Sequence, residues 1–204
     1  MKSFLFAFAA VSLGTAGLFG QSAPAVKVDI KAPKISNIQT PQFQAGNVPD
    51  KNWRPKDWLE VDMEFDIKLP PAAGGRSGSL PSMTVHYYLG MNGTTSDNRF
   101  QVLKGTFEYV DIPASERCHA LAFVAPATLR RVLQKDGFTA GSDLKAWGVE
   151  VIVDGQRVAG ESSTGKTWWE DTTKLSINEN VMLAKKDTPF GILWGDYDVG
   201  VKNK

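Results

Sequence analysis

Residues 58–69 constrain the fold more than any other part of the chain. Their sequence is WLEVDMEFDIKL, in which apolar and charged residues alternate without a break from Leu59 to Leu69. Successive side chains of a β-strand point to opposite faces, so this alternation gives one face to a core and the other to water. At helical spacing the same residues would form no continuous apolar stripe. We therefore predict a strand of roughly 35–40 Å, which needs partners of comparable length.

The first twenty residues have the pattern of a secretory signal peptide. Lys2 precedes an apolar run from Phe4 to Phe19, and small residues follow near Gly20 to Ala23. Export and cleavage use a short basic start, an apolar segment and small residues after it. A membrane anchor is the alternative, although glycine and threonine interrupt the run. We expect residues 1–20 to be removed and the protein to reach the periplasm, the outer membrane or the outside of the cell.

The composition is that of an ordinary soluble domain, with 42% hydrophobic and 22% charged residues among 204. Removal of residues 1–20 takes away one lysine and no acid, which leaves 22 basic and 22 acidic residues and a formal net charge of zero. This balance does not favour binding to nucleic acid or to an anionic membrane surface. Cys118 is the only cysteine, so an intrachain disulfide is excluded and stability must come from the core.

Proline and glycine interrupt residues 21–54, which we expect to form an extended N-terminal arm that docks in pieces. The sandwich domain is expected to span residues 55–204. Short strands are predicted within the arm at 25–31 and 35–38. Further strands are predicted in the domain at 83–89, 100–110, 120–124, 147–153, 156–159 and 181–184.

Two local signals are the clearest in the second half of the chain. Asp154-Gly155 between two alternating runs predicts a β-hairpin, because both central residues of that turn need positive φ. Residues 126–135 predict one short helix, with Pro126 in its first turn and Gly137 just after its end. About seven or eight strands with one inserted helix indicate a mainly β protein, an antiparallel β-sandwich with immunoglobulin-like topology as the leading version.

Residues 160–167, GESSTGKT, match the pattern of the phosphate-binding loop of nucleotide hydrolases. That loop functions between a parallel strand and the N-terminus of a helix, where backbone amides surround the phosphates. Here it leaves a hairpin and leads into a weak helix former, TWWEDTT. We therefore interpret it as a polar loop and expect no nucleotide.

No spacing in the sequence predicts a catalytic or metal site. His86 and His119 are the only histidines, whereas a metal site needs three or four converging ligands and a nucleophile needs an oriented base. Carboxylates such as Glu60 and Glu64 could in principle hydrolyse glycosides, but a solvated sheet face explains them better. We expect no catalytic residues, no metal and no cofactor, and therefore not an enzyme.

Six tryptophans are more than the size of the chain requires. Four of them lie beside predicted loops: Trp53, Trp58, Trp168 and Trp169. An exposed indole can stack on a sugar ring or anchor a protein partner, so these are candidate partner or glycan contacts. The alternative is that most of them fill the ends of the sandwich.

The C-terminal sequence VMLAKKDTPFGILWGDYD, with Trp168-Trp169-Glu170 ahead of it, resembles a family of secreted, pilus-associated verrucomicrobial proteins of the Akkermansia type. The resemblance implies an immunoglobulin-like sandwich and a role around type IV pilus machinery. It carries no catalytic residues that could be transferred to this chain.

The leading hypothesis is an exported, non-enzymatic, pilus-associated protein that acts in assembly or adhesion through protein–protein contacts. Its partner would be a pilus component, an outer-envelope component or a second copy, without nucleic acid and without a transmembrane segment in the mature chain. The N-terminal arm and open sheet edges are the expected contact surfaces. A carbohydrate-binding β-sandwich module is the alternative, and a secreted hydrolase is the third.

We predict that the mature protein begins near residues 21–24, because cleavage follows the apolar run at small residues. N-terminal sequencing of the protein from the cell envelope tests this directly. Recovery of a chain that still begins at Met1 would contradict it.

Overall fold

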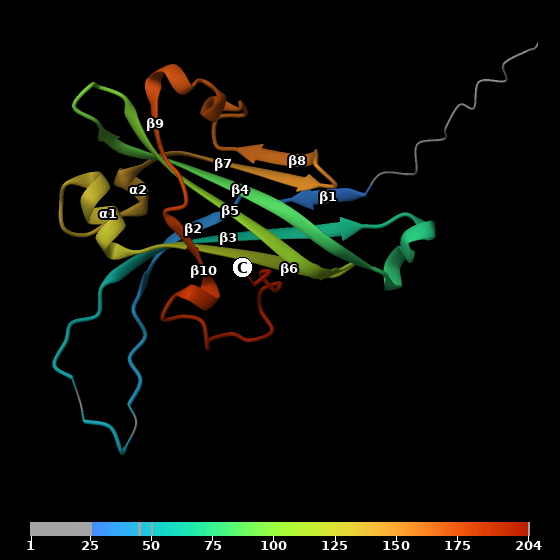
Figure 1. The fold of residues 1–204 in the computed structure, drawn as a ribbon, viewed down its shortest axis with the longest axis horizontal. Coiled ribbons are helices and arrows are strands. Elements are labelled where there is room, and N and C mark those ends of the chain that lie inside the picture. Colours follow the sequence, from blue (N-terminus) through green and yellow to red (C-terminus); the bar gives the residue numbers. More distant parts are fainter. Residues whose placement is uncertain (1–25, 45, 50, 204) are drawn as a thin grey trace, which may run out of the picture.

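The structure, a computed structural model, describes residues 26–44, 46–49 and 51–203, so the expected signal peptide lies outside the described residues. Two five-stranded sheets pack face to face (Figure 1). The predicted mainly β sandwich is confirmed, with ten strands in the described ranges instead of seven or eight.

Sheet A contains β1 (Lys27–Ile30), β2 (Lys34–Gln39), β3 (Asp57–Lys68), β6 (Arg117–Val124) and β10 (Met182–Ala184). Sheet B contains β4 (Ser79–Thr94), β5 (Phe100–Pro113), β7 (Leu144–Val153), β8 (Gln156–Ser162) and β9 (Leu175–Asn178). The helices are α1 (Pro126–Leu133) and α2 (Ala140–Asp143). Single-turn 3₁₀ helices are η1 (Pro71–Ala73), η2 (Gly75–Ser77), η3 (Trp168–Glu170), η4 (Thr172–Lys174) and η5 (Lys185–Asp187).

Strand β3 is the centre of sheet A. On one side β1 pairs with its C-terminal half and β2 with its N-terminal half, and on the other side β6 runs antiparallel to it. The predicted strand at 58–69 is confirmed almost residue for residue. The described part of the expected arm thus docks in two pieces, as strands β1 and β2.

The core lies between the two sheets. The apolar residues of β3 point into it and are fully buried: Leu59, Val61, Met63, Phe65 and Ile67. Sheet B contributes Tyr87 and Tyr109, whose hydroxyls lie 3.2 Å apart and reach the carbonyls of Ala120 and Leu121. Both tyrosine hydroxyls therefore have hydrogen-bond partners inside the core, as buried hydroxyl groups require.

A second, smaller cluster covers the outer face of sheet B. Trp169 stacks on Tyr88 with ring centroids 4.8 Å apart. It stands over Gly148, where an added Cβ would lie 2.0 Å from its ring, so only glycine fits there. Val102 belongs to this cluster while Leu103 points into the main core. These two adjacent apolar residues of β5 are thus buried on opposite faces of sheet B.

Residues 185–203, here called the C-terminal strap, cross the outer face of sheet A (Figure 1). Phe190 is its anchor, because it is fully buried and stacks on Phe123 of β6 at 5.0 Å. The nearly buried Lys185 ion-pairs with Asp198 and donates to the carbonyl oxygen of Trp194, which holds the strap in a closed loop. The predicted packing of 190–197 on the sheets is confirmed.

The end of the strap closes one side of the sandwich. The Val199 N–H donates to the carbonyl of His119 in β6, and the Val110 N–H of β5 donates to the carbonyl of Gly200. The strap therefore bridges an edge of sheet A to an edge of sheet B, and both edges lose free backbone groups there.

We predict that Phe190→Ala lowers the free energy of unfolding by about 3–5 kcal/mol, because a fully buried aromatic side chain leaves a cavity. Ile192→Ala is the matched control in the same strap, since Ile192 is 78% exposed, and its effect should stay within about 0.5 kcal/mol. Urea unfolding measures both. Equal effects of the two substitutions would contradict the anchoring role of Phe190.

Candidate functional site

The loop between β2 and β3, described at residues 40–44, 46–49 and 51–56, projects from the end of sheet A (Figure 1). Its base is closed by Thr40, whose N–H donates to the carbonyl of Lys56 at 3.0 Å. The Thr40 hydroxyl oxygen also accepts a hydrogen bond from the Trp58 indole at 3.1 Å. These hydrogen bonds fix the base of the loop to the start of β3.

Large apolar side chains on this loop face water. Phe43 is 58% exposed, Val48 is 59% exposed and Trp53 is 49% exposed. The three line one hollow of about 370 Å³ together with Pro49 and Lys51. Exposed apolar groups gathered on a rigid base are typical of a surface that contacts another macromolecule.

A larger hollow of about 750 Å³ lies between helix α1 and the start of β3. Helix α1 begins at Pro126, buries Leu129 and Val132 against the core, and ends where Gln134 adopts a left-handed conformation with φ 55°. Its exposed side and the turn after it carry cationic side chains. The charged residues that line the hollow are Lys56, Asp57, Arg130, Arg131, Lys135 and Asp136.

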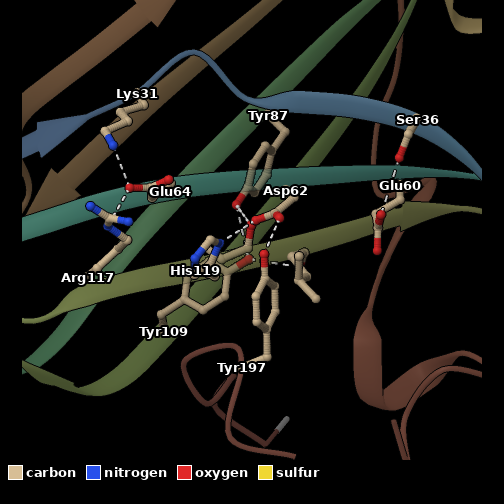
Figure 2. A network of polar contacts seen from close by, with 12 residues as sticks. Lys31, Ser36, Glu60, Asp62, Glu64, Tyr87, Tyr109, Arg117, His119 and Tyr197 are labelled. Carbon is tan, nitrogen blue, oxygen red and sulfur yellow. Dashed lines mark hydrogen bonds and ion pairs between the residues drawn. The ribbon is translucent and has the colours of Figure 1, made fainter. Parts of the chain in front are cut away.

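Three carboxylates of β3, Glu60, Asp62 and Glu64, form a row on the outer face of sheet A, and each of the three contacts a neighbouring element (Figure 2). Ser36 of β2 donates to Glu60 at 3.3 Å. Lys31 donates to Glu64 at 2.6 Å, and Arg117 of β6 pairs with the same oxygen at 2.8 Å. The hydrogen bond from Lys31, with the charge of Arg117 added, holds the pKa of Glu64 below its usual range. The sequence predicted that this row is a solvated face. In the structure its side chains instead link β3 to neighbouring elements.

Asp62 is the hub of this row (Figure 2). Its two oxygens contact His119 Nδ1 at 2.8 Å and the Tyr197 hydroxyl at 2.6 Å, while the two rings stack at 4.2 Å. Burial and the hydrogen bond to Asp62 raise the pKa of Tyr197. In a nucleophile–histidine–aspartate triad the histidine lies in the middle, whereas here the carboxylate does. The cluster therefore fastens the C-terminal strap to sheet A.

The four tryptophans that the sequence identified as candidate contacts lie in three different places. Trp53 is exposed in the β2–β3 loop, whereas Trp58 packs edge-on against Phe190. Trp168 and Trp169 pack on the outer face of sheet B. Sequence reasoning missed the exposed residues Phe43, Val48, Ile192 and Trp194, because apolar residues without periodicity carry no signal of exposure.

The sheet edge opposite the strap is protected. There β1 lies near β8, and the outer side of β8 has no backbone partner among the residues described. The pairing of β8 with β7 is shifted between Val151 and Ile152, which is a bulge. Arg157 lies over Gly160, and Glu161 stands opposite the inward-facing Val149. Bulges and charges of this kind discourage edge-to-edge pairing.

The pattern GESSTGKT forms the end of β8 and a polar turn. The Ser163 N–H donates to the carbonyl of Trp147, and the Gly165 N–H donates to the carbonyl of Ser162. The single turn η3 follows in place of a longer helix, and among the described strands β8 pairs only with the antiparallel β7. The loop geometry of a phosphate site is therefore not formed.

The described ranges hold no group of three or more His, Cys, Asp or Glu side chains that could bind a metal ion. No helix in the described part of the chain is long and apolar enough to cross a membrane. Burial raises the pKa of the Cys118 thiol to about 11, so the thiol is protonated and unreactive at neutral pH.

Comparisons with known proteins agree with this architecture. A family model matches residues 20–204. Among solved structures, the chain is similar to a crystal structure from Akkermansia muciniphila, with a TM-score of 0.78 and 22% sequence identity over 88% of this chain and 95% of that chain. At this identity the structural match shows a shared fold. No curated protein matches the sequence.

We predict that Lys166→Ala leaves the protein folded and that neither form binds ATP with magnesium, because no helix N-terminus receives the phosphates. Calorimetric titration of ATP tests this. Micromolar binding by the unchanged protein that is lost in the variant would contradict it.

Proposed function

The chain belongs to the Akkermansia-type family that its C-terminal sequence resembles, since the family model spans residues 20–204, and we propose that it is an exported, pilus-associated protein. It acts by binding a protein component of the pilus or outer envelope through the β2–β3 loop. It carries out no turnover chemistry.

The observation that carries this proposal is the projecting loop with Phe43, Val48 and Trp53 exposed to water. Aromatic side chains dominate the energetics of protein interfaces, because each buries a large area at little entropic cost. The loop base is held by hydrogen bonds of Thr40 to Lys56 and Trp58. A partner would therefore meet a loop whose base is already held in place, which reduces the cost of ordering on binding.

The other surfaces of the sandwich are occupied or protected, which also favours the β2–β3 loop as the binding surface. The strap occupies the β5 and β6 side of the sandwich, and a bulge and charges protect β8. The most conspicuous polar cluster, centred on Asp62, is used to fasten the strap. Binding through the loop is thus better supported than the sheet-edge assembly expected from the sequence.

The test compares the chain, expressed with its own leader and purified after export, with the double variant Phe43→Ala/Trp53→Ala. Envelope extract from the producing organism is passed over each, and captured proteins are then purified and titrated individually. We expect a pilus component to bind the unchanged protein and to bind the variant at least about tenfold more weakly, since loss of interface aromatics costs more than about 1 kcal/mol each.

The matched control is Ile192→Ala/Trp194→Ala, which likewise truncates two exposed apolar side chains, here on the strap. It should bind as the unchanged protein does. The proposal fails if no pilus component binds, or if the loop variant and the strap variant bind equally well.

A further inference from the structure

We propose that the hollow beside helix α1 binds an acidic segment of the protein partner, with one or two carboxylates placed between Lys56 and Arg131. This inference rests on the proposed function and names the chemistry of the partner. It depends on the shape of the hollow, on the distribution of charge around it and on its position at the base of the β2–β3 loop.

The hollow combines an apolar wall with a cationic rim. Pro126, Leu129 and Phe138 form the wall, and Leu129 and Phe138 belong to the main core, so this wall is rigid. Its volume of about 750 Å³ is twice that of the hollow in the projecting loop. Several side chains of a peptide can therefore enter, including an apolar residue next to an acid.

Two of the four cations that line the hollow already have a carboxylate partner. Arg130 pairs with Asp136 at 3.1 Å, although both side chains are largely exposed and the pair is weak. Lys135 pairs with the buried Asp143 at 2.7 Å, and Asp143 also accepts the N–H of Thr139. These contacts hold the turn after α1 in place.

The other two cations, Lys56 and Arg131, have no carboxylate partner among the described residues. Arg131 is oriented by a hydrogen bond to the Asn178 side chain of β9 at 3.3 Å. Asp57 is the one opposing carboxylate left on the rim. Arg54 lies two residues before Lys56 in the sequence, so the Cα atoms of the two residues are at most about 7 Å apart. The hollow is therefore positive, with a guanidinium available for bidentate binding of a carboxylate.

The amount of charge decides between an acidic protein segment and a polyanion. Nucleic acids and sulfated polysaccharides need a stripe of many cations, whereas this rim offers two and the chain without residues 1–20 has a formal net charge of zero. A short protein segment with one or two carboxylates matches that number. Lys56 also closes the loop base through Thr40, so the loop that carries Phe43 and Trp53 is continuous in the chain with the rim of the hollow.

The test is an NMR titration of the ¹⁵N-labelled chain, expressed with its own leader and purified after export. The probes are a short capped peptide of alternating glutamate and leucine, its glutamine counterpart, and heparin. We expect the glutamate peptide to shift the amides of α1 and of residues 56–57, and the glutamine peptide to leave them unchanged. Lys56→Gln/Arg131→Gln should weaken binding by about tenfold, as two partly exposed charge pairs are lost.

The control Lys166→Gln/Lys174→Gln removes the same charge from exposed lysines elsewhere and should leave the affinity unchanged. The spectra also show directly whether each variant is folded. The inference is overturned if the glutamate peptide does not bind at α1, if the two double variants bind it equally, or if heparin binds there more tightly. In each case loop-dependent binding of a pilus component would survive, so failure here is distinct from failure of the proposed function.

Discussion

The alternation along β3 is the constraint on which the rest of the structure depends, because both of its faces are used. The inward residues Leu59 to Ile67 form the centre of the core, and the outward carboxylates Glu60, Asp62 and Glu64 each hold a neighbouring element. A shift of one residue would exchange the two faces and bury four acids, Glu60, Asp62, Glu64 and Asp66. The register of β1, β2 and β6 and the position of the C-terminal strap all follow from this one strand.

The strap and the protected edge explain why the sandwich presents loops instead of strands to its surroundings. Phe190 and the Lys185–Asp198 ion pair fold the strap onto sheet A, and its end joins β6 to β5. A buried pair of this kind gives little net stability, but together with the hydrogen bond from Lys185 to the carbonyl of Trp194 it closes the strap into a loop. The described residues leave exposed apolar side chains on the β2–β3 loop and a positive hollow between α1 and the start of β3.

Local signals in the sequence predicted much of the fold. The strand at 58–69, the Asp154-Gly155 hairpin and the helix that begins at Pro126 depend on neighbouring residues, and all three are found. The parallel pairing of β9 with β5 was missed because it joins Phe100 to Leu175, which no local pattern encodes. Likewise, Asp62 and His119 meet only through the register of β3 and β6. Trp169 is buried because Gly148 leaves room for it on another strand.

Cross-linking of the protein in intact cell envelopes, followed by mass spectrometry, tests the central claim most directly. Lys51 and Lys56 lie on the β2–β3 loop and its base, whereas Lys27 and Lys68 lie on the far half of sheet A, where β1 pairs with β3. The account predicts intermolecular cross-links to a pilus or envelope protein from Lys51 and Lys56. Cross-links to other proteins that arise only from Lys27 and Lys68 would contradict it.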